Sequence, residues 1–132
     1  ERFIGGRHGS WNYFRRYYVN GSAYGGLVGN AAGFTRYLQA LLPGGAFARY
    51  GEQIAAGSQD GKEFPVSLGW YKGTLDGMNY FAHAGGGGGF YCEIRFYPGA
   101  NRTSAIMLNR TGISDERLLD GIDPGFLKSG GL

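Results

Sequence analysis

Four stretches rich in aromatic and aliphatic residues, joined by short links of turn-forming residues, dominate the second half of the chain. The stretches cover residues 64–71, 78–83, 90–97 and 103–109, and the links cover 73–77, 85–89 and 98–101. Glycine, proline, asparagine and aspartate recur in these links, as is typical of tight turns. Links this short join strands that run in opposite directions. We therefore predict an antiparallel meander over residues 64–109.

The residues before these strands have the 3.6-residue spacing of amphipathic helices. Apolar residues fall on one face of the segment 31–42, Asn30 stands at the position of an N-cap, and Pro43 ends the run. A second helix is predicted over 46–56, with Gly57 as its terminator. The side chains of this second helix that we expect to face inward are those of Phe47, Tyr50 and Ile54.

The two ends of the chain complete the predicted organisation. Ser114 caps a predicted C-terminal helix over 114–123, which Pro124 ends. Residues 1–29 show neither the 3.6-residue spacing of a helix nor the two-residue alternation of a strand. They are predicted to be an irregular lead-in rich in aromatic and basic residues. The order of helix, helix, sheet, helix predicts the fold class α/β of the α+β type, an antiparallel sheet of three to four strands flanked by helices. A chain of 132 residues is one domain or a fragment of one.

Composition excludes several classes of protein. Glycine supplies 27 of the residues, but only 4 prolines and the lack of a three-residue period exclude a collagen-like chain. The 42% hydrophobic content excludes a disordered chain. No apolar run approaches the about 20 residues of a membrane-spanning helix. Cys92 is the single cysteine, and with two histidines it predicts neither a disulfide framework nor a metal or cofactor site.

The charge of the chain gives a weak indication of partners. The net charge is +3, and basic residues gather near the start, where Arg15 and Arg16 lie among aromatic residues. Arginine beside aromatic rings can bind single-stranded nucleic acid through phosphate contacts and base stacking. The rest of the chain has no matching basic stripe, so nucleic acid is not an expected partner.

Five consecutive glycines occupy residues 85–89. A phosphate-binding loop needs a Lys-Ser/Thr pair and a helix that follows it, whereas here the strand-like sequence FYCEI follows. That sequence disfavours a phosphate loop. A purely structural alternative remains open, in which the glycines permit a wide hairpin turn.

The residues around this run bear a resemblance to a known family. The segment HAGGGGGF at 83–90 resembles the H-x-G-G-x-x-G-F segment of serine β-lactamase-like hydrolases, a superfamily of class C β-lactamases, penicillin-binding DD-peptidases, D-aminopeptidases and family VIII esterases. The segment YGGLVGNAAGF at 24–34 looks like the family's G-G-L-x-S-T-A-x-D-L segment. SLGW at 67–70 resembles its G-L-G-W strand, and IMLNR at 106–110 resembles its last strand. The resemblance covers residues from about 21 to 122 in the family's order.

The resemblance implies roles for three residues. His83 stands where the family has the Lys or His that opens its third active-site motif, and Gly85 is that motif's glycine. Gly86 stands at the position whose backbone N–H supplies one of the two oxyanion-hole donors. Ala84 replaces the family's frequent Thr or Ser, which suits an esterase or amidase better than a dedicated lactamase. The implied reaction is acyl transfer from an ester, amide or β-lactam, and the implied partner is a small-molecule substrate.

The chain departs from the family at its nucleophile. The family's S-x-x-K is absent, and the nearest match, SDER at 114–117, falls in the predicted C-terminal helix. YVN at 18–20 imitates the second motif but precedes the Gly-Gly-Leu segment too closely. Residue 1 is Glu and not Met. We therefore predict a C-terminal portion of such a hydrolase, inactive by itself.

Two functions from different classes follow as expectations. The first is this hydrolase portion, which would associate with the complementary N-terminal part of the same protein or with itself through an exposed sheet edge. It would be periplasmic or secreted if the resemblance holds, or cytoplasmic for an esterase-type member. The second is a non-catalytic module whose Tyr- and Trp-rich surface binds a glycan or a peptide.

Overall fold

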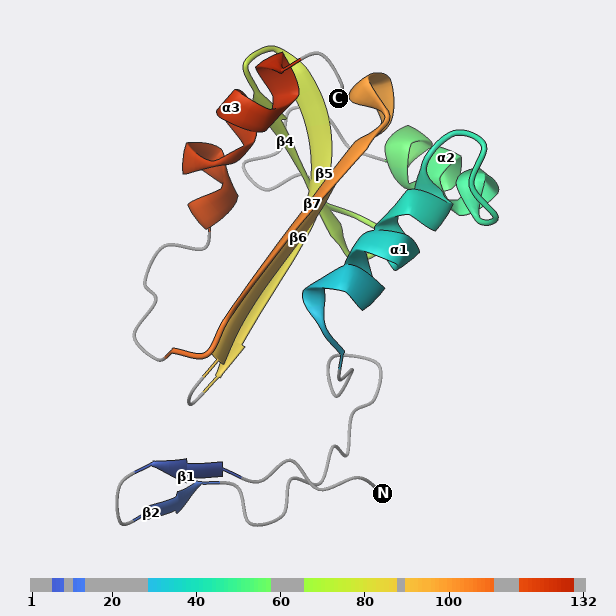
Figure 1. Ribbon diagram of the computed structural model, residues 1–132. Coiled ribbons are helices and arrows are strands. Elements are labelled where there is room, and N and C mark those ends of the chain that lie inside the picture. Colours follow the sequence, from blue (N-terminus) through green and yellow to red (C-terminus); the bar gives the residue numbers. More distant parts are fainter. Residues whose placement is uncertain are drawn as a thin grey trace.

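A five-stranded antiparallel sheet with helices on both faces forms the body of the protein. The computed structural model (Figure 1) describes residues 6–8, 11–13, 29–57, 66–87, 90–110 and 117–129. Its fold class is α+β, and the strands of the sheet follow one another in sequence order, as the short links predicted. These strands are β3 (Val66–Ser67), β4 (Trp70–Leu75), β5 (Met78–Gly87), β6 (Phe90–Tyr97) and β7 (Arg102–Leu108).

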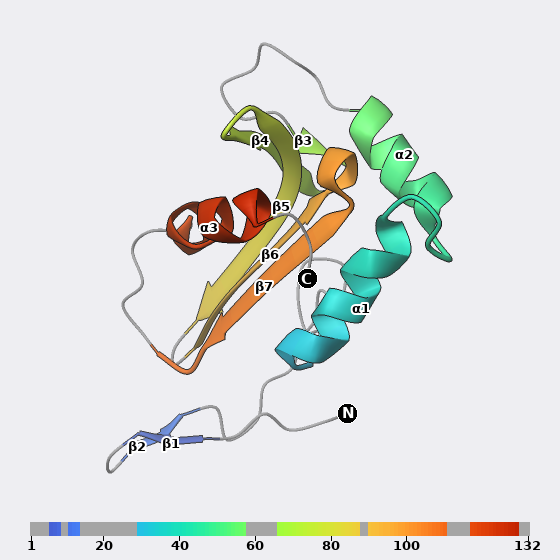
Figure 2. The same cartoon turned by 45° about the horizontal axis from the view of Figure 1, so that its top comes forward.

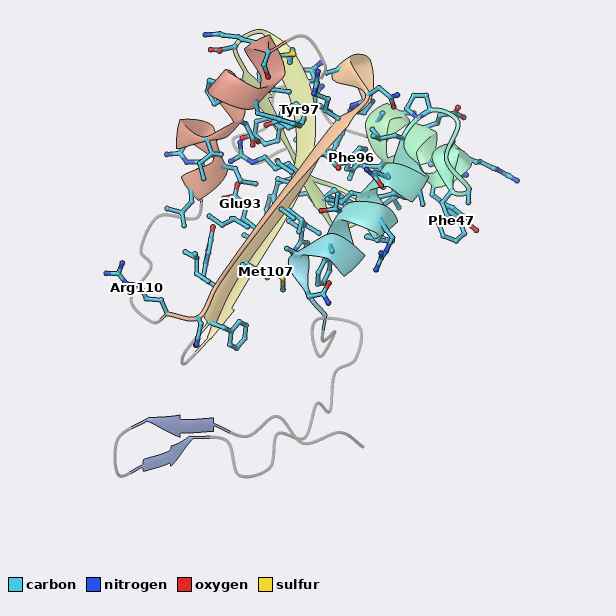
Figure 3. The ribbon with its side chains drawn as sticks, in the orientation of Figure 1. Phe47, Glu93, Phe96, Tyr97, Met107 and Arg110 are labelled. Atoms are coloured by element: carbon cyan, nitrogen blue, oxygen red, sulfur yellow. The ribbon has the colours of Figure 1, made fainter. Side chains whose placement is uncertain are left out.

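Helices cover the two faces of this sheet. Helices α1 (Ala31–Leu41) and α2 (Ala48–Ala56) lie on one face, and the short helices η2 (Leu118–Gly121) and α3 (Asp123–Lys128) lie on the other (Figures 1 and 2). The side chains of β6 therefore meet helices on both sides. Phe96 points toward α1, whereas Glu93 and Tyr97 point toward η2 and α3 (Figure 3).

The first helix is built as its sequence predicts. Asn30 caps it, because its side-chain oxygen accepts a hydrogen bond of 2.8 Å from the Gly33 N–H. The apolar core on this face of the sheet consists of Leu38, Leu41, Leu42, Ile54, Trp70, Phe81, Ile94 and Phe96.

The inward face predicted for the second helix is wrong in part. Ile54 is buried, but Phe47 is 48% exposed and Tyr50 is 59% exposed. Helix α2 lies close to the C-terminal end of α1, where a side chain at Gly51 would collide with the Leu41 carbonyl. Because the two helices are so close, only a narrow face of α2 can be buried against α1. The rings of Phe47 and Tyr50 lie outside that face and pack edge to face against each other.

The predicted first strand is divided in two by a turn at Leu68 and Gly69. The link predicted over 73–77 shrinks to Asp76 and Gly77, because β4 runs on to Leu75. A side chain at Gly73 would collide with the Tyr80 ring, so glycine lets that ring lie across the strand. The sheet therefore has five strands where three to four were predicted.

Only the second half of the C-terminal helix predicted over 114–123 lies among the described residues. Its expected start lies in residues 111–116, outside the described part, and residues 118–121 form η2. Pro124 was expected to end a helix but stands in the first turn of α3, where a missing N–H costs no hydrogen bond. Within the predicted irregular lead-in over 1–29, β1 (Gly6–His8) and β2 (Trp11–Tyr13) pair as antiparallel strands. The other residues of 1–28 lie outside the described part.

A buried network of charged and polar groups joins the sheet to η2. Arg95 and Glu93 are each 1% exposed, and the Arg95 Nε donates to Glu93 Oε1 at 2.7 Å. The Leu119 N–H donates to the other Glu93 oxygen at 3.1 Å. A second guanidinium nitrogen, Nη1, lies 2.6 Å from Asp120 Oδ1. The guanidinium also stacks on the Tyr80 ring, 4.3 Å from its centroid.

The network continues through Asp123, which joins α3 to the sheet. Asp123 is 1% exposed, and its Oδ2 accepts hydrogen bonds from the Tyr97 hydroxyl at 2.5 Å and the Ser104 hydroxyl at 2.9 Å. Burial, and then the bond to Asp123, raise the pKa of Tyr97, so its hydroxyl stays a donor. The short α3 is thus held by hydrogen bonds from two strands, β6 and β7.

Burial acts in opposite senses on the two central charges of this network. Burial raises the pKa of the Glu93 carboxyl, and the Leu119 N–H and Arg95 oppose that shift. Burial by itself would lower the pKa of Arg95, but its bonds with Tyr97 and Asp120 and the charge of Glu93 raise it above the ordinary value. Arg95 is therefore charged at every pH at which the protein folds.

We expect strand β7 to associate with another strand. Among the described residues β7 pairs with β6 alone, and positions 103–108 contain no charge or proline to discourage addition of a strand. Sedimentation at several concentrations should therefore show self-association, which Met107→Lys should reduce by placing a charge on the edge. A monomer at every concentration, with the amides of residues 105–108 strongly protected from exchange, would contradict the expectation.

Candidate functional site

The predicted site residues His83, Gly85 and Gly86 lie together on the last part of β5, where one edge of the strand is open. Strand β4 pairs with β5 only as far as Ala82, whereas β6 pairs with it as far as Gly87. Figure 2 shows β4 beside only part of the length of β5. Among the described residues, no strand adjoins positions 84–87 on the side away from β6, because β4 begins at Trp70, beside His83.

This open edge presents backbone donors. The N–H groups of successive residues in a strand point to opposite edges, so one of Gly85 and Gly86 directs its N–H to β6 and the other directs its N–H to the open edge. The register pairs Gly85 with Cys92 and Gly86 with Tyr91. The arrangement can therefore offer a strand N–H to a carbonyl oxygen that approaches from outside.

Neither backbone conformation nor packing requires glycine at these two positions. Positive φ angles occur at Gly44, Gly69 and Gly77 among the described glycines, and not at Gly85 or Gly86. The nearest atom to an added Cβ lies at 3.6 Å in both cases, an ordinary van der Waals contact. Glycine weakens a strand, and in an exposed strand it marks a place where another group approaches the backbone closely.

His83 stands beside these glycines with its side chain exposed. Its ring lies 6.4 Å from the Trp70 ring and 6.3 Å from the Tyr71 ring, measured between centroids. Tyr37 of α1 stacks on the same Trp70 at 6.5 Å. His83 is thus held among aromatic rings of β4 and is open to an incoming molecule.

Cys92 is a poor candidate for the nucleophile of this site. It is half-buried on β6 opposite Gly85. Burial raises the pKa of its thiol, and a backbone hydrogen bond with Gly85 only partly opposes that shift. A thiol with a raised pKa holds little of the reactive thiolate near neutral pH.

The buried network described above supports β5 through its neighbouring strand β6. Glu93 pairs with Ala84 across the ladder, and Arg95 pairs with Ala82. Both side chains hold β6 to η2, so the strand that carries the candidate donors rests on a fixed partner. The sequence reasoning missed this support because it assigned no role to Glu93 or Arg95. A signal was available in the segment that follows β7. Its helices η2 and α3 cover the second face of the sheet and so bury the side chains of β6 that point to that face.

Comparison with known proteins adds no identity to this site. No protein-family model, no curated protein and no solved structure matches the chain. The chemistry of this site is therefore inferred from its geometry.

Two other kinds of feature are absent from the described residues. In the part of the chain that the structure describes, no three His, Cys, Asp or Glu side chains gather as a metal site would require. No helix in that part is long and apolar enough to cross a bilayer. The YVN triplet at 18–20 and Ser114 lie outside the described residues. The same holds for residues 24–28 of the Gly-Gly-Leu segment.

Proposed function

We propose that this chain is the C-terminal portion of a β-lactamase-like serine hydrolase, which cleaves an ester, amide or β-lactam by acyl transfer. Gly85 and Gly86 carry this proposal, because they lie at the open edge of β5, where neither φ nor packing requires glycine. A substrate carbonyl that must lie against the strand explains both glycines.

In this proposal β5 forms one wall of the active site. The attacked carbonyl oxygen gains negative charge, and a strand N–H held 2.7–3.1 Å away, about the ordinary hydrogen-bond length, stabilises that charge. Gly86 supplies this N–H and His83 orients hydroxyl groups or a substrate anion beside it. The nucleophilic serine and its lysine come from outside residues 1–132, since the chain holds no S-x-x-K.

The isolated chain should not form an acyl-enzyme. A fluorophosphonate probe or a chromogenic p-nitrophenyl ester should leave its serines unlabelled, because none has an adjacent general base in an S-x-x-K arrangement. A longer protein with S-x-x-K and then Y-x-N upstream of Glu1 should be labelled at that serine. Stoichiometric labelling of a serine within residues 1–132, or an unrelated upstream domain, would overturn the proposal.

The binding module is the second candidate, favoured by the exposed aromatic rings of Phe47 and Tyr50 on α2. It predicts that the isolated chain binds glycans or peptides and that the longer protein resists the probe. Replacement of Tyr50 with Ala should then abolish binding and should have no effect on any hydrolysis.

A further inference from the structure

The ring of His83 contacts two successive residues of β4 whose side chains point to opposite faces of the sheet. Trp70 belongs to the apolar core under α1 and α2, as Phe96 does. Tyr71 is the next residue of the strand and therefore points to the other face. The centroid of the His83 ring nevertheless lies 6.4 Å from that of Trp70 and 6.3 Å from that of Tyr71. A ring within reach of both faces lies at the edge of the strand and not over either face.

This position is where the open part of β5 begins. Strand β4 starts at Trp70, which stands opposite His83 in the register because the next residue, Tyr71, pairs with Ala82. From position 84 onward β5 continues beside β6 alone among the described residues. The imidazole of His83 therefore borders the backbone groups of the open edge.

Trp70 is a fixed wall on one side of this imidazole. It is buried, and its ring packs edge to face against Phe96 at 5.1 Å and is stacked with Tyr37 at 6.5 Å, measured between centroids. Contacts from β6 and from α1 thus hold the indole in place. Its position is set by the core and does not depend on His83.

Tyr71, on the other side of the imidazole, fills no part of that core. It is 50% exposed and pairs with Val66 on one side and with Ala82 on the other. The small side chain of Ala82 leaves the Tyr71 ring room to lean along β5 toward His83, and the planes of the two rings meet at 48°. An exposed aromatic ring that meets an exposed imidazole restricts the positions that the imidazole can take.

We infer that Tyr71 is a positioning residue for His83 and that, with Trp70 as the opposite wall, it confines the imidazole to the open edge of β5. An exposed histidine without such contacts distributes over several rotamers, and each rotamer directs its ring nitrogens elsewhere. The ring contacts of Tyr71 and Trp70 instead keep those nitrogens beside Gly85 and Gly86. The positioning of His83 stands on the geometry alone, and only its effect on turnover rests on the proposed function.

The rotamers of His83 in the chain of residues 1–132 test this inference without any catalysis. Couplings between the Hα and Hβ protons, measured by NMR, report the rotamer populations, and comparison with His83→Ala assigns the signals. The natural chain should favour one χ1 rotamer. Tyr71→Ala should lower the ratio of that rotamer to the others by about two- to tenfold, the equivalent of one aromatic contact. Tyr71→Thr, which keeps a residue that favours strands, should give the same loss without weakening β4.

Two control variants separate the ring contact from other effects. Tyr71→Phe keeps the ring and should keep the natural rotamer ratio, whereas Tyr50→Ala removes an exposed ring from α2 and should leave the ratio unchanged. The same rotamer ratio in the natural chain, Tyr71→Ala and Tyr71→Thr would overturn the inference. A loss in Tyr71→Phe as large as that in Tyr71→Ala would overturn it too, because the hydroxyl and not the ring would then act on His83.

Turnover of a p-nitrophenyl ester by a longer hydrolase that carries this chain gives the second readout. Tyr71→Ala should lower kcat by up to about tenfold, in step with the loss of the favoured rotamer, and Tyr71→Phe should restore it. A changed rotamer ratio with an unchanged kcat, or a longer protein that hydrolyses no ester, would refute the role of His83 in the proposed function. Either result would leave its positioning by Tyr71 confirmed.

Discussion

Replacing Arg95 with Met should destabilise the protein by about 3–5 kcal/mol, the usual cost of removing one partner from a buried ion pair. Methionine fills similar space, so the loss comes from charge and not from a cavity. Glu93 is 1% exposed, and among the described residues it would keep only the Leu119 N–H and the Tyr91 hydroxyl, at 3.4 Å, as hydrogen-bond donors. Urea unfolding at neutral pH, followed by circular dichroism, measures this loss.

A matched variant and a second substitution make this prediction specific. Arg49→Met removes an exposed arginine from α2 and should change stability by no more than about 0.5 kcal/mol. Adding Glu93→Gln to Arg95→Met should restore part of the loss, because the amide oxygen can still accept the Leu119 N–H without a buried charge. A loss in Arg95→Met no larger than that in Arg49→Met would show that the network contributes nothing.

The cost of Arg95→Met should shrink in acid. Burial raises the pKa of Glu93 in the folded protein, and removing Arg95, which opposes that shift, raises it further. A carboxyl with a raised folded pKa binds its proton more tightly when folded, so stability falls as pH rises through that pKa. The variant should therefore gain stability as pH is lowered from neutral to about 4.3, the ordinary value for glutamate. A pH-independent loss would contradict a buried carboxylate as its cause.

Replacing Gly86 with Pro, in a longer hydrolase that carries this chain, should lower kcat by about 10²–10³, the usual loss when one oxyanion-hole donor is removed. Proline removes the N–H, and in the proposed site, where the Gly86 N–H faces the open edge, this change breaks no ladder bond. Gly86→Ala keeps the N–H and has room in the fold, since its Cβ would meet its nearest atom at 3.6 Å. Alanine should therefore act only by obstructing the substrate. Steady-state hydrolysis of a p-nitrophenyl ester, beside the unfolding midpoint of each variant, provides both readouts.

Two further variants test whether β5 lines an active site or has only a structural role. His83→Ala should lower turnover with little loss of stability, because His83 is exposed and fills no part of the core. Gly99→Ala, where no atom lies within 4 Å of the added Cβ, is the control for a glycine outside the site. If His83→Ala unfolds the protein while the folded fraction keeps its specific activity, or if Gly86→Pro leaves kcat unchanged, β5 is not a wall of an active site.

Local signals in the sequence were enough for the order of the elements. The Asn30 cap, the spacing of Leu38 and Leu41, and the short links between strands depend on interactions within a few residues, so the sequence alone predicted helices followed by an antiparallel sheet. The sequence also placed His83 near Gly85 and Gly86, because they are close in the chain, but it assigned the two glycines to a link, whereas β5 runs on to Gly87. Their proposed chemistry is still a proposal.

Only the tertiary structure decided which side chains are buried and which strand edges are open. Glu93 and Arg95 are buried because η2 and α3 cover a second face of the sheet, and Tyr50 is exposed because α2 approaches α1 too closely to turn that ring inward. The room for a Cβ at Gly85 and Gly86, and the end of β4 before His83, likewise depend on neighbours distant in sequence. Turns and caps are determined by a few adjacent residues, whereas burial and exposure are set by contacts between segments whose relative positions no local pattern specifies.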